Sequence, residues 1–172
     1  MNRTLLASFF GSVLLLAPAL GIAKSSDRNQ PMNLDAGHQT GTLDGTGKYT
    51  LSGGVIVTQG TMDIRSANGE ISMRDGEVIN VTFTGSPVTL KQQMEDGSPM
   101  TATANRVDYD MIKDIVVFTG NYTVKSPKGS NSGQKMVYNL KTGTMESGGD
   151  GTRVRTIIQP KSTQQTKVLP KD

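Results

Sequence analysis

The stretch from Ala104 to Val124, ANRVDYDMIKDIVVFTGNYTV, contains two patterns that recur along the chain. In its first half, Val107, Tyr109 and Met111 alternate with aspartates. An apolar period of two is typical of a β-strand with one buried face and one face in water. The second half adds a β-prone run around a Thr-Gly pair, so the stretch predicts two adjacent strands.

Both patterns appear again elsewhere in the chain. An apolar residue, a hydroxyl residue, a glycine and a β-prone run occur in Leu51–Val57, Phe83–Thr89 and Phe118–Val124, with a weaker copy at Gly151–Arg155. The glycines of these copies lie 32, 35 and 31 residues apart. The alternating pattern recurs in Ala67–Met73 and Gly133–Leu140. A period in this range indicates stacked supersecondary units.

Turn signals separate the expected strands. They are Asp44-Gly45, Asn68-Gly69, Asp75-Gly76, Asp96-Gly97, Lys128-Gly129, Thr142-Gly143 and Gly148-Gly149. Such pairs supply the positive φ angles that tight turns require. No window after the first segment has the period of an amphipathic helix, so we expect an all-β chain of about a dozen or more short strands.

Composition narrows the class of protein. The chain has 172 residues, of which 34% are hydrophobic and 19% charged, with a formal net charge of +3. This size fits one domain with tails, and the small charge argues against a dedicated nucleic-acid binder. With no Cys and a single His, disulfides, thiolate metal sites and a polyhistidine metal site are excluded.

Residues 1–23 have the features of a secretory signal peptide. Arg3 gives the positive start, an apolar run follows, and Gly21-Ile22-Ala23 places small residues where signal peptidase cleaves. The apolar run is shorter than the ~20 residues of a membrane-spanning helix. We therefore expect cleavage after Ala23, export to the periplasm and a folded domain over residues 24–158. Residues 159–172 contain two prolines and little to bury, which predicts a disordered basic tail.

No catalytic set or metal site stands out. Asp108, Asp110 and Asp114 form the densest group of carboxylates, but the order of residues is wrong for a calcium loop, and the first two lie on the polar face of a strand. The sequence at 44–47 contains Asp and Thr-Gly in the wrong order for an aspartic protease, so we expect a turn. His38 has no evident nucleophile to serve. We predict a protein that is not an enzyme and has no cofactor.

The expected buried face is made of medium-sized residues with several methionines and no Trp. Two interpretations of this face remain open from the pattern alone. One is a dry, self-filled core. The other is a slot for an apolar ligand, since flexible Met side chains adapt to irregular apolar shapes.

Three blocks of the sequence resemble the OstA-like family of bacterial lipopolysaccharide-export proteins. They are QPMNLDA at Gln30–Ala36, LSGGVIVTQGTM at Leu51–Met62, and Ala104–Val124. The similarity extends over roughly Asn29–Ile158 in one collinear order. Gly54 and Leu90 depart from the family pattern, in which Asn and an aromatic residue are usual.

The resemblance implies a half-open β-jellyroll, in which two facing antiparallel sheets enclose a hydrophobic groove for the acyl chains of lipid A. The groove residues that we expect on this basis are Met32, Leu34, Val55, Val57, Ile64, Leu90, Val107, Tyr109, Met111, Phe118, Met136 and Tyr138. The residues expected at the terminal strand edges are Met32, Asn33, Leu34, Val154, Arg155 and Thr156.

The implied partners are lipopolysaccharide, an inner-membrane LptC-like protein, the N-terminal domain of an outer-membrane LptD-like translocon, and further copies of the chain in a head-to-tail oligomer. No nucleic-acid partner is expected. Two other classes stay open at this point: a structural β-solenoid scaffold or adhesin with a dry core, and a polysaccharide-acting β-helix enzyme. The lack of clustered inward-facing acids argues against the enzyme.

Overall fold

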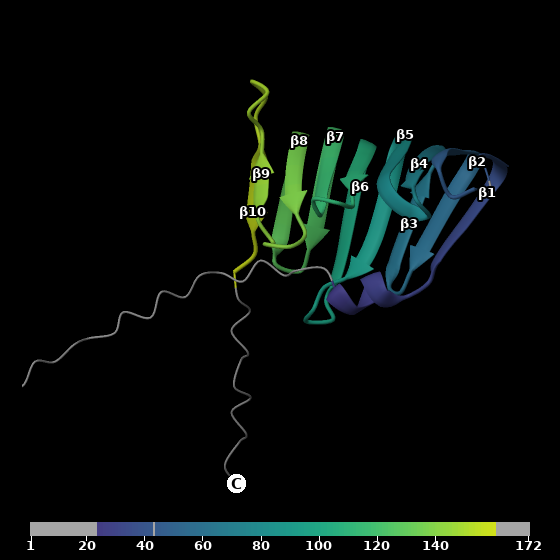
Figure 1. Cartoon of the computed structure of the whole chain (residues 1–172). Helices are drawn as coiled ribbons and strands as arrows, with labels where there is room; N and C mark the ends of the chain where they lie inside the picture. The colour runs from purple at the N-terminus through teal and green to yellow at the C-terminus, as the bar shows by residue number, and fades with distance from the viewer. Residues whose placement is uncertain (1–23, 43, 161–172) are drawn as a thin grey trace, which may run out of the picture.

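The computed structural model describes residues 24–42 and 44–160, and nearly all of this part of the chain is antiparallel β-structure (Figure 1). The elements are η1 (Ser25–Asn29), β1 (Met32–Thr40), β2 (Gly47–Gln59), β3 (Met62–Ser66), β4 (Asn68–Arg74), β5 (Glu77–Gln93), β6 (Pro99–Asp110), β7 (Ile115–Ser126), β8 (Gly129–Asn139), β9 (Met145–Ser147) and β10 (Arg155–Ile158). The all-β prediction is confirmed. The predicted signal peptide and most of the predicted tail lie outside the described residues.

Most consecutive strands pair with each other, and the exceptions are β3 with β4 and β9 with β10. The main path runs β1-β2-β3-β5-β6-β7-β8-β10, with β4 between β2 and β5 and with β9 on β8. All the pairs are antiparallel. The fold is therefore a meander in which each hairpin packs on the one before it.

Each long strand bends near its middle, and this bend creates two sheets. The pairing register shifts between Ala36 and His38 in β1, between Thr84 and Val88 in β5, and at corresponding points of β6 and β7. We call the two halves sheet A and sheet B. Sheet A contains residues 32–36, 55–59, 62–66, 88–93, 99–104, 122–126, 129–133 and 155–158, and sheet B contains 38–40, 47–52, 68–74, 77–84, 106–110, 115–119, 135–139 and 145–147.

This geometry explains why the sequence predicts short strands where the structure has long ones. β5 alone has 17 residues, but its bend interrupts the alternation of apolar and polar residues, so each half has the pattern of a separate strand. Two pairs of elements are the halves of one interrupted strand. β3 and β4 are separated only by Ala67, and β9 and β10 by the segment 148–154. The architecture is the half-open β-jellyroll expected above, with strands that continue from one sheet into the other.

The glycines of the sequence repeat mark these bends. At the first bend, a Cβ on Gly37 would lie 2.8 Å from the carbonyl oxygen of Gly53, whose φ is +77°. At a later bend, Gly120 has a φ of +79° and faces Asn105 too closely for a side chain. At the first bend glycine is needed because two backbones approach each other, and at Gly53 and Gly120 also because φ is positive. Each copy of the sequence repeat therefore contains the glycine of one bend.

One predicted turn is wrong. Asn68-Gly69 lies inside β4, where Gly69 pairs with Leu51 on one side and Phe83 on the other. A Cβ on Gly69 would lie 3.3 Å from Leu51 Cδ1 and 3.4 Å from the Phe83 ring. Gly69 thus makes room for two larger neighbours in the core. The prediction failed because the dipeptide Asn-Gly, which is typical of a turn, here lies within a strand.

The core lies between the two sheets. Its buried members come from both, and they are Leu51, Val55, Val57, Ile64, Ile71, Val81, Phe83, Val88, Ala102, Ala104, Val107, Val116, Phe118, Tyr122 and Met136.

Candidate functional site

An apolar cavity of about 100 Å³ lies between sheet A and sheet B. The sheet A parts of β1, β2, β3, β5 and β6 form one wall. Strand β4 and the sheet B parts of β5 to β8 form the other. Its apolar lining is Met32, Leu34, Val57, Met62, Ile64, Ile71, Val81, Phe83, Leu90, Met100, Val107, Tyr109, Val116, Phe118, Tyr138 and Leu140. The alternation of the strands turns these side chains inward from both walls.

Most of the groove residues predicted from the sequence line this cavity. They are Met32, Leu34, Val57, Ile64, Leu90, Val107, Tyr109, Phe118 and Tyr138. Val55 and Met136 are buried in the core beside it, and Met111 packs against that core. Leu34 is 39% exposed and lies where the cavity meets solvent.

The predicted groove set omitted several lining residues. Six of them are apolar and belong to alternating runs, so strand periodicity could have found them: Met62, Ile71, Val81, Phe83, Met100 and Leu140. Val116 lies in the continuous apolar run 115–118, where alternation gives no direction. The polar lining residues are Lys24, Asp27, Gln59 and Gln92. No local signal in the sequence identifies these, because the fold brings them together from η1, the residue before it, β2 and β5.

The η1 turn closes one end of the cavity with a buried carboxylate. Asp27 is only 4% exposed. Its Oδ2 accepts hydrogen bonds from Thr61 Oγ1 at 2.5 Å and from Gln92 Nε2 at 3.2 Å. The Lys24 backbone N–H also donates to the Gln93 carbonyl at 3.1 Å, which fixes the start of the turn on β5.

These contacts keep Asp27 ionised. Burial by itself would raise the pKa of Asp27, but the hydrogen bonds from Thr61 and Gln92 and the charge of Lys24 outweigh it, so the pKa lies below its ordinary value. The cavity is therefore apolar along its walls and polar at the η1 end, where the carboxylate of Asp27 lies near the cation of Lys24.

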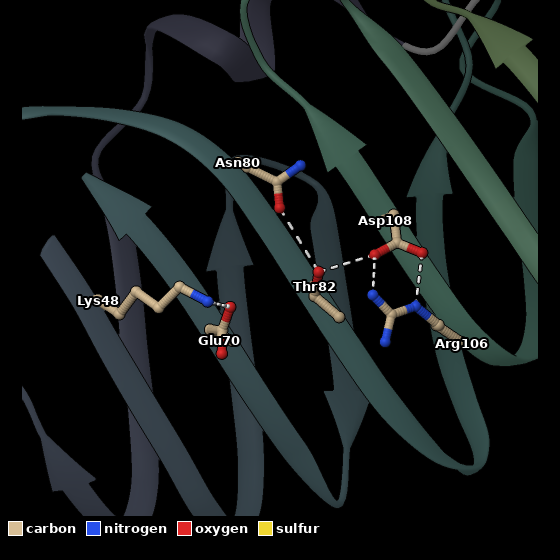
Figure 2. Close-up of polar contacts among 6 residues, drawn as sticks. All are labelled: Lys48, Glu70, Asn80, Thr82, Arg106 and Asp108. Atoms are coloured by element: carbon tan, nitrogen blue, oxygen red, sulfur yellow. Dashed lines mark hydrogen bonds and ion pairs between the residues drawn. The ribbon is translucent and has the colours of Figure 1, made fainter. Parts of the chain in front are cut away.

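The outer face of sheet B is polar (Figure 2). Asp108 accepts two hydrogen bonds from Arg106, at 2.7 and 2.6 Å, and a third from Thr82 Oγ1 at 2.7 Å. Lys48 and Glu70 form a separate ion pair at 2.7 Å. The carboxylate of Asp108 raises the pKa of Arg106. Asp108 thus lies on the polar face, as predicted, while its neighbour Tyr109 lines the cavity.

The two ends of the sheets carry unpaired strand edges among the described residues. β1 pairs only with β2, and β10 pairs only with β8. The predicted edge residues Met32, Asn33 and Leu34 lie in β1, and Arg155 and Thr156 lie in β10. Val154 precedes β10 and is not part of the strand.

The direction of the backbone groups on β10 follows from its register. The Gln159 N–H donates to the Lys128 carbonyl at 3.0 Å, one position beyond the pair Ile158 and Gly129. Because such bonds alternate along an antiparallel pair, the N–H groups of Thr156 and Ile158 point away from β8. Ile158 is 81% exposed. β10 therefore offers free backbone donors and an apolar side chain at its outer edge.

Comparison with known proteins identifies this architecture. The family described as "LptA/(LptD N-terminal domain) LPS transport protein" matches residues 33–144. The chain belongs to this family.

Relatives of the family match over most of the length of the chain. The lipopolysaccharide export system protein LptA of Escherichia coli K12 is 31% identical over 166 residues, which cover 95% of this chain and 89% of that protein. LptA of Haemophilus influenzae is 29% identical over 162 residues, covering 92% and 94%.

A solved structure agrees with the fold. The crystal structure of LptH from Pseudomonas aeruginosa, described as the LptA-homologous periplasmic component of the lipopolysaccharide transport device, has a TM-score of 0.69 and 25% identity. The match covers 78% of this chain and 99% of that one.

The remaining motifs have structural roles in this member of the LptA family. Asp44 Oδ1 accepts the Thr42 hydroxyl at 2.8 Å and the Thr46 N–H at 2.9 Å, which makes the predicted turn. His38 is exposed and contacts the Thr40 hydroxyl at 3.0 Å. Asp110 pairs with Lys113, which lowers the pKa of the carboxyl group.

Two further findings concern residues 24–42 and 44–160. No group of three His, Cys, Asp or Glu side chains there could hold a metal ion. The helix found there is the five-residue η1. No helix in these residues is long and apolar enough to cross a membrane.

Proposed function

We propose that this protein binds lipopolysaccharide in the periplasm and passes it from the inner-membrane export complex toward the outer-membrane translocon. The observation that carries the proposal is the cavity between the sheets, which is lined on both walls by apolar side chains. The outer face of sheet B, in contrast, carries ion pairs. Membership of a lipopolysaccharide-transport family and the names of the relatives support the same cargo.

The apolar walls match what the lipid needs during transport. Each exposed methylene of an acyl chain costs about 0.8 kcal/mol, so ten methylenes in water cost about 8 kcal/mol. A groove that covers the chains removes this cost while the sugars and phosphates stay in water. The protein has no bond to make or break in this process, so we propose that it is a carrier and not an enzyme.

The cavity must enlarge to hold this cargo. Its volume of about 100 Å³ has room for about seven to ten water molecules at ~10–15 Å³ of accessible volume each, which is too small for several acyl chains. Half-buried methionines such as Met62 and Met100 line it and have flexible side chains. We infer that sheet A and sheet B move apart when lipid enters.

The free edges provide the route between molecules. Unpaired strand edges are normally covered or charged, because they pair with other strands. Here β1 and β10 lie at opposite ends of the sheets (Figure 1), so β10 of one copy can pair with β1 of the next and align their grooves. We propose head-to-tail oligomers that end on an LptC-like inner-membrane protein and on the N-terminal domain of an LptD-like translocon.

Native mass spectrometry of the purified protein with lipopolysaccharide tests the groove. Leu34→Asp places a charge at the cavity mouth, where the native side chain is 39% exposed, so the fold should tolerate it. We expect this variant to lose most bound lipid. Ile112→Asp is the matched control, because Ile112 is 68% exposed and lies in the turn after β6, outside the cavity lining.

Equal lipid retention by wild type and both variants would refute the groove. Retention by neither wild type nor control would favour the dry-core scaffold instead.

A further inference from the structure

A second hollow, separate from the lipid cavity, lies at the bend near the C-terminal end of the sheets. Its volume is about 360 Å³, and it is open to solvent. We call it the C-terminal hollow. Its lining is Asn121, Tyr122, Thr123, Ser132, Gly133, Gln134, Thr152, Arg153 and Arg155. Apart from the Tyr122 ring, the lining side chains are all polar or charged, which contrasts with the lipid cavity.

Three side chains of the hollow lie in register on neighbouring strands. Thr123 of β7 pairs with Ser132 of β8, and Ser132 pairs with Arg155 of β10. Asn131, in the adjacent row, is buried and faces the inner side of the sheet. Thr123, Ser132 and Arg155 therefore form a row of two hydroxyls and a guanidinium on the outer face of sheet A.

An amide pair borders this row at the bend. Gln134 Nε2 donates to Asn121 Oδ1 at 2.8 Å, and the Asn121 N–H donates to Gln134 Oε1 at 3.2 Å. Asn121 has a φ of +48° and lies at the register shift of β7. The bend thus fixes both amides beside the hydroxyl row, where they can contact a polar ligand.

The segment 148–154 forms the opposite side of the hollow. Asp150 Oδ1 accepts the Thr152 N–H at 3.0 Å and the Thr152 hydroxyl at 2.6 Å, which shapes this segment. Arg153 follows directly. Arg153 and Arg155 have no ion pair with any other described residue, whereas Arg65 and Arg106 each pair with an aspartate.

We propose that the C-terminal hollow binds an acidic saccharide, through a phosphate or carboxylate group held by Arg153 and Arg155. The planar guanidinium matches both anions in a bidentate geometry, and hydroxyl and amide side chains suit the neighbouring sugar hydroxyls. The inference rests on the proposed function, because the water-exposed part of lipopolysaccharide is a saccharide that carries such anions.

NMR titration of the purified protein with the water-soluble saccharide of fully deacylated lipopolysaccharide tests this site. The saccharide should shift backbone resonances around Ser132 and Thr152, and Arg153→Gln with Arg155→Gln should weaken its binding about tenfold or more. Arg74→Gln is the matched control, since Arg74 is an exposed arginine at the end of β4, away from the hollow. Inorganic phosphate at the same concentration should give much smaller shifts.

Unchanged saccharide binding by the double variant would overturn the proposal, and so would phosphate shifts equal to those of the saccharide. A third contradicting result is that the wild type binds no saccharide while the double variant loses self-association. The last result would assign the arginines to a protein contact. Native mass spectrometry with intact lipopolysaccharide separates this failure from failure of the proposed function. Lipid retained in the groove without saccharide binding would refute the hollow alone.

Discussion

Tyr122 donates its hydroxyl to Asn131 Oδ1 at 2.6 Å, and both side chains are buried. Asn131 also donates Nδ2 to Thr156 Oγ1 at 2.9 Å and accepts the Ser147 hydroxyl at 3.2 Å. One buried amide therefore connects β7, β8, β9 and β10. The terminal strand is held in place by this cluster as well as by its short ladder on β8.

Asn131→Ala should loosen the terminal strand. The substitution leaves the buried hydroxyl of Tyr122 without its partner, which costs about 1–3 kcal/mol. It also removes the contact that holds Thr156 of the exposed strand β10. We expect this loss in the free energy of unfolding measured with urea, together with faster amide exchange at residues 155–158. Tyr122→Phe is the control, because it removes one hydroxyl and keeps the Asn131 contact with Thr156. Unchanged exchange in Asn131→Ala would contradict the role of the cluster.

Ile158→Pro should reduce self-association. The Ile158 N–H points away from β8, so proline removes a donor from the free edge while the internal ladder remains. Ile158→Ala keeps the N–H and separates the backbone contribution from that of the side chain. Proline at Arg155 would break a bond to β8 and is a weaker test. Sedimentation velocity over a range of concentrations measures the effect, and equal association of Ile158→Pro and wild type would rule out β10 as the docking strand.

The docking of η1 should weaken in acid. The pKa of Asp27 in the folded protein lies below its model-compound value of 3.8, so the contribution of the carboxylate to stability is complete above about pH 4 and is lost as the pH falls through the lower folded-state pKa. Urea unfolding of wild type and Asp27→Asn from pH 7 downward measures this. The stability difference, about 1–3 kcal/mol at neutral pH, should shrink in acid. A difference that stays constant with pH would refute the ionised carboxylate.

Lipid should separate the two sheets. The sequence has no cysteine, so pairs of introduced cysteines take spin labels uniquely. Lys91 lies on the outer face of sheet A and Lys135 on that of sheet B, and both are exposed. The distance between labels at Lys91→Cys and Lys135→Cys, measured by pulsed electron paramagnetic resonance, should increase with lipopolysaccharide. Labels at Lys91→Cys and Lys125→Cys, both on sheet A, should keep their distance. A fixed distance in the first pair would contradict opening.

Local alternation was enough to predict the walls of the groove. Val107 and Tyr109 face inward and Asp108 faces outward because a strand without a bulge keeps its period of two. At a bend itself this reasoning fails. Tyr122 is 1% exposed, yet it follows the positive-φ residues Gly120 and Asn121, which interrupt the alternation.

The polar end of the cavity could not be predicted from the sequence. Asp27 meets Thr61 and Gln92 only because η1 folds back across β3 and β5, and no spacing in the sequence encodes such contacts. The same holds for the C-terminal hollow, where the bend of β7 and β8 meets the segment before β10.

The neighbours Tyr109 and Asp108 give the most direct test of the central claim, that lipid lies between the sheets. A photo-crosslinking amino acid at each position, in cells that make lipopolysaccharide, samples the cavity at residue 109 and the outer face of sheet B at residue 108. If lipid lies between the sheets, lipopolysaccharide adducts form at Tyr109 and none form at Asp108. Equal labelling at the two positions, or labelling at Asp108 alone, would contradict it.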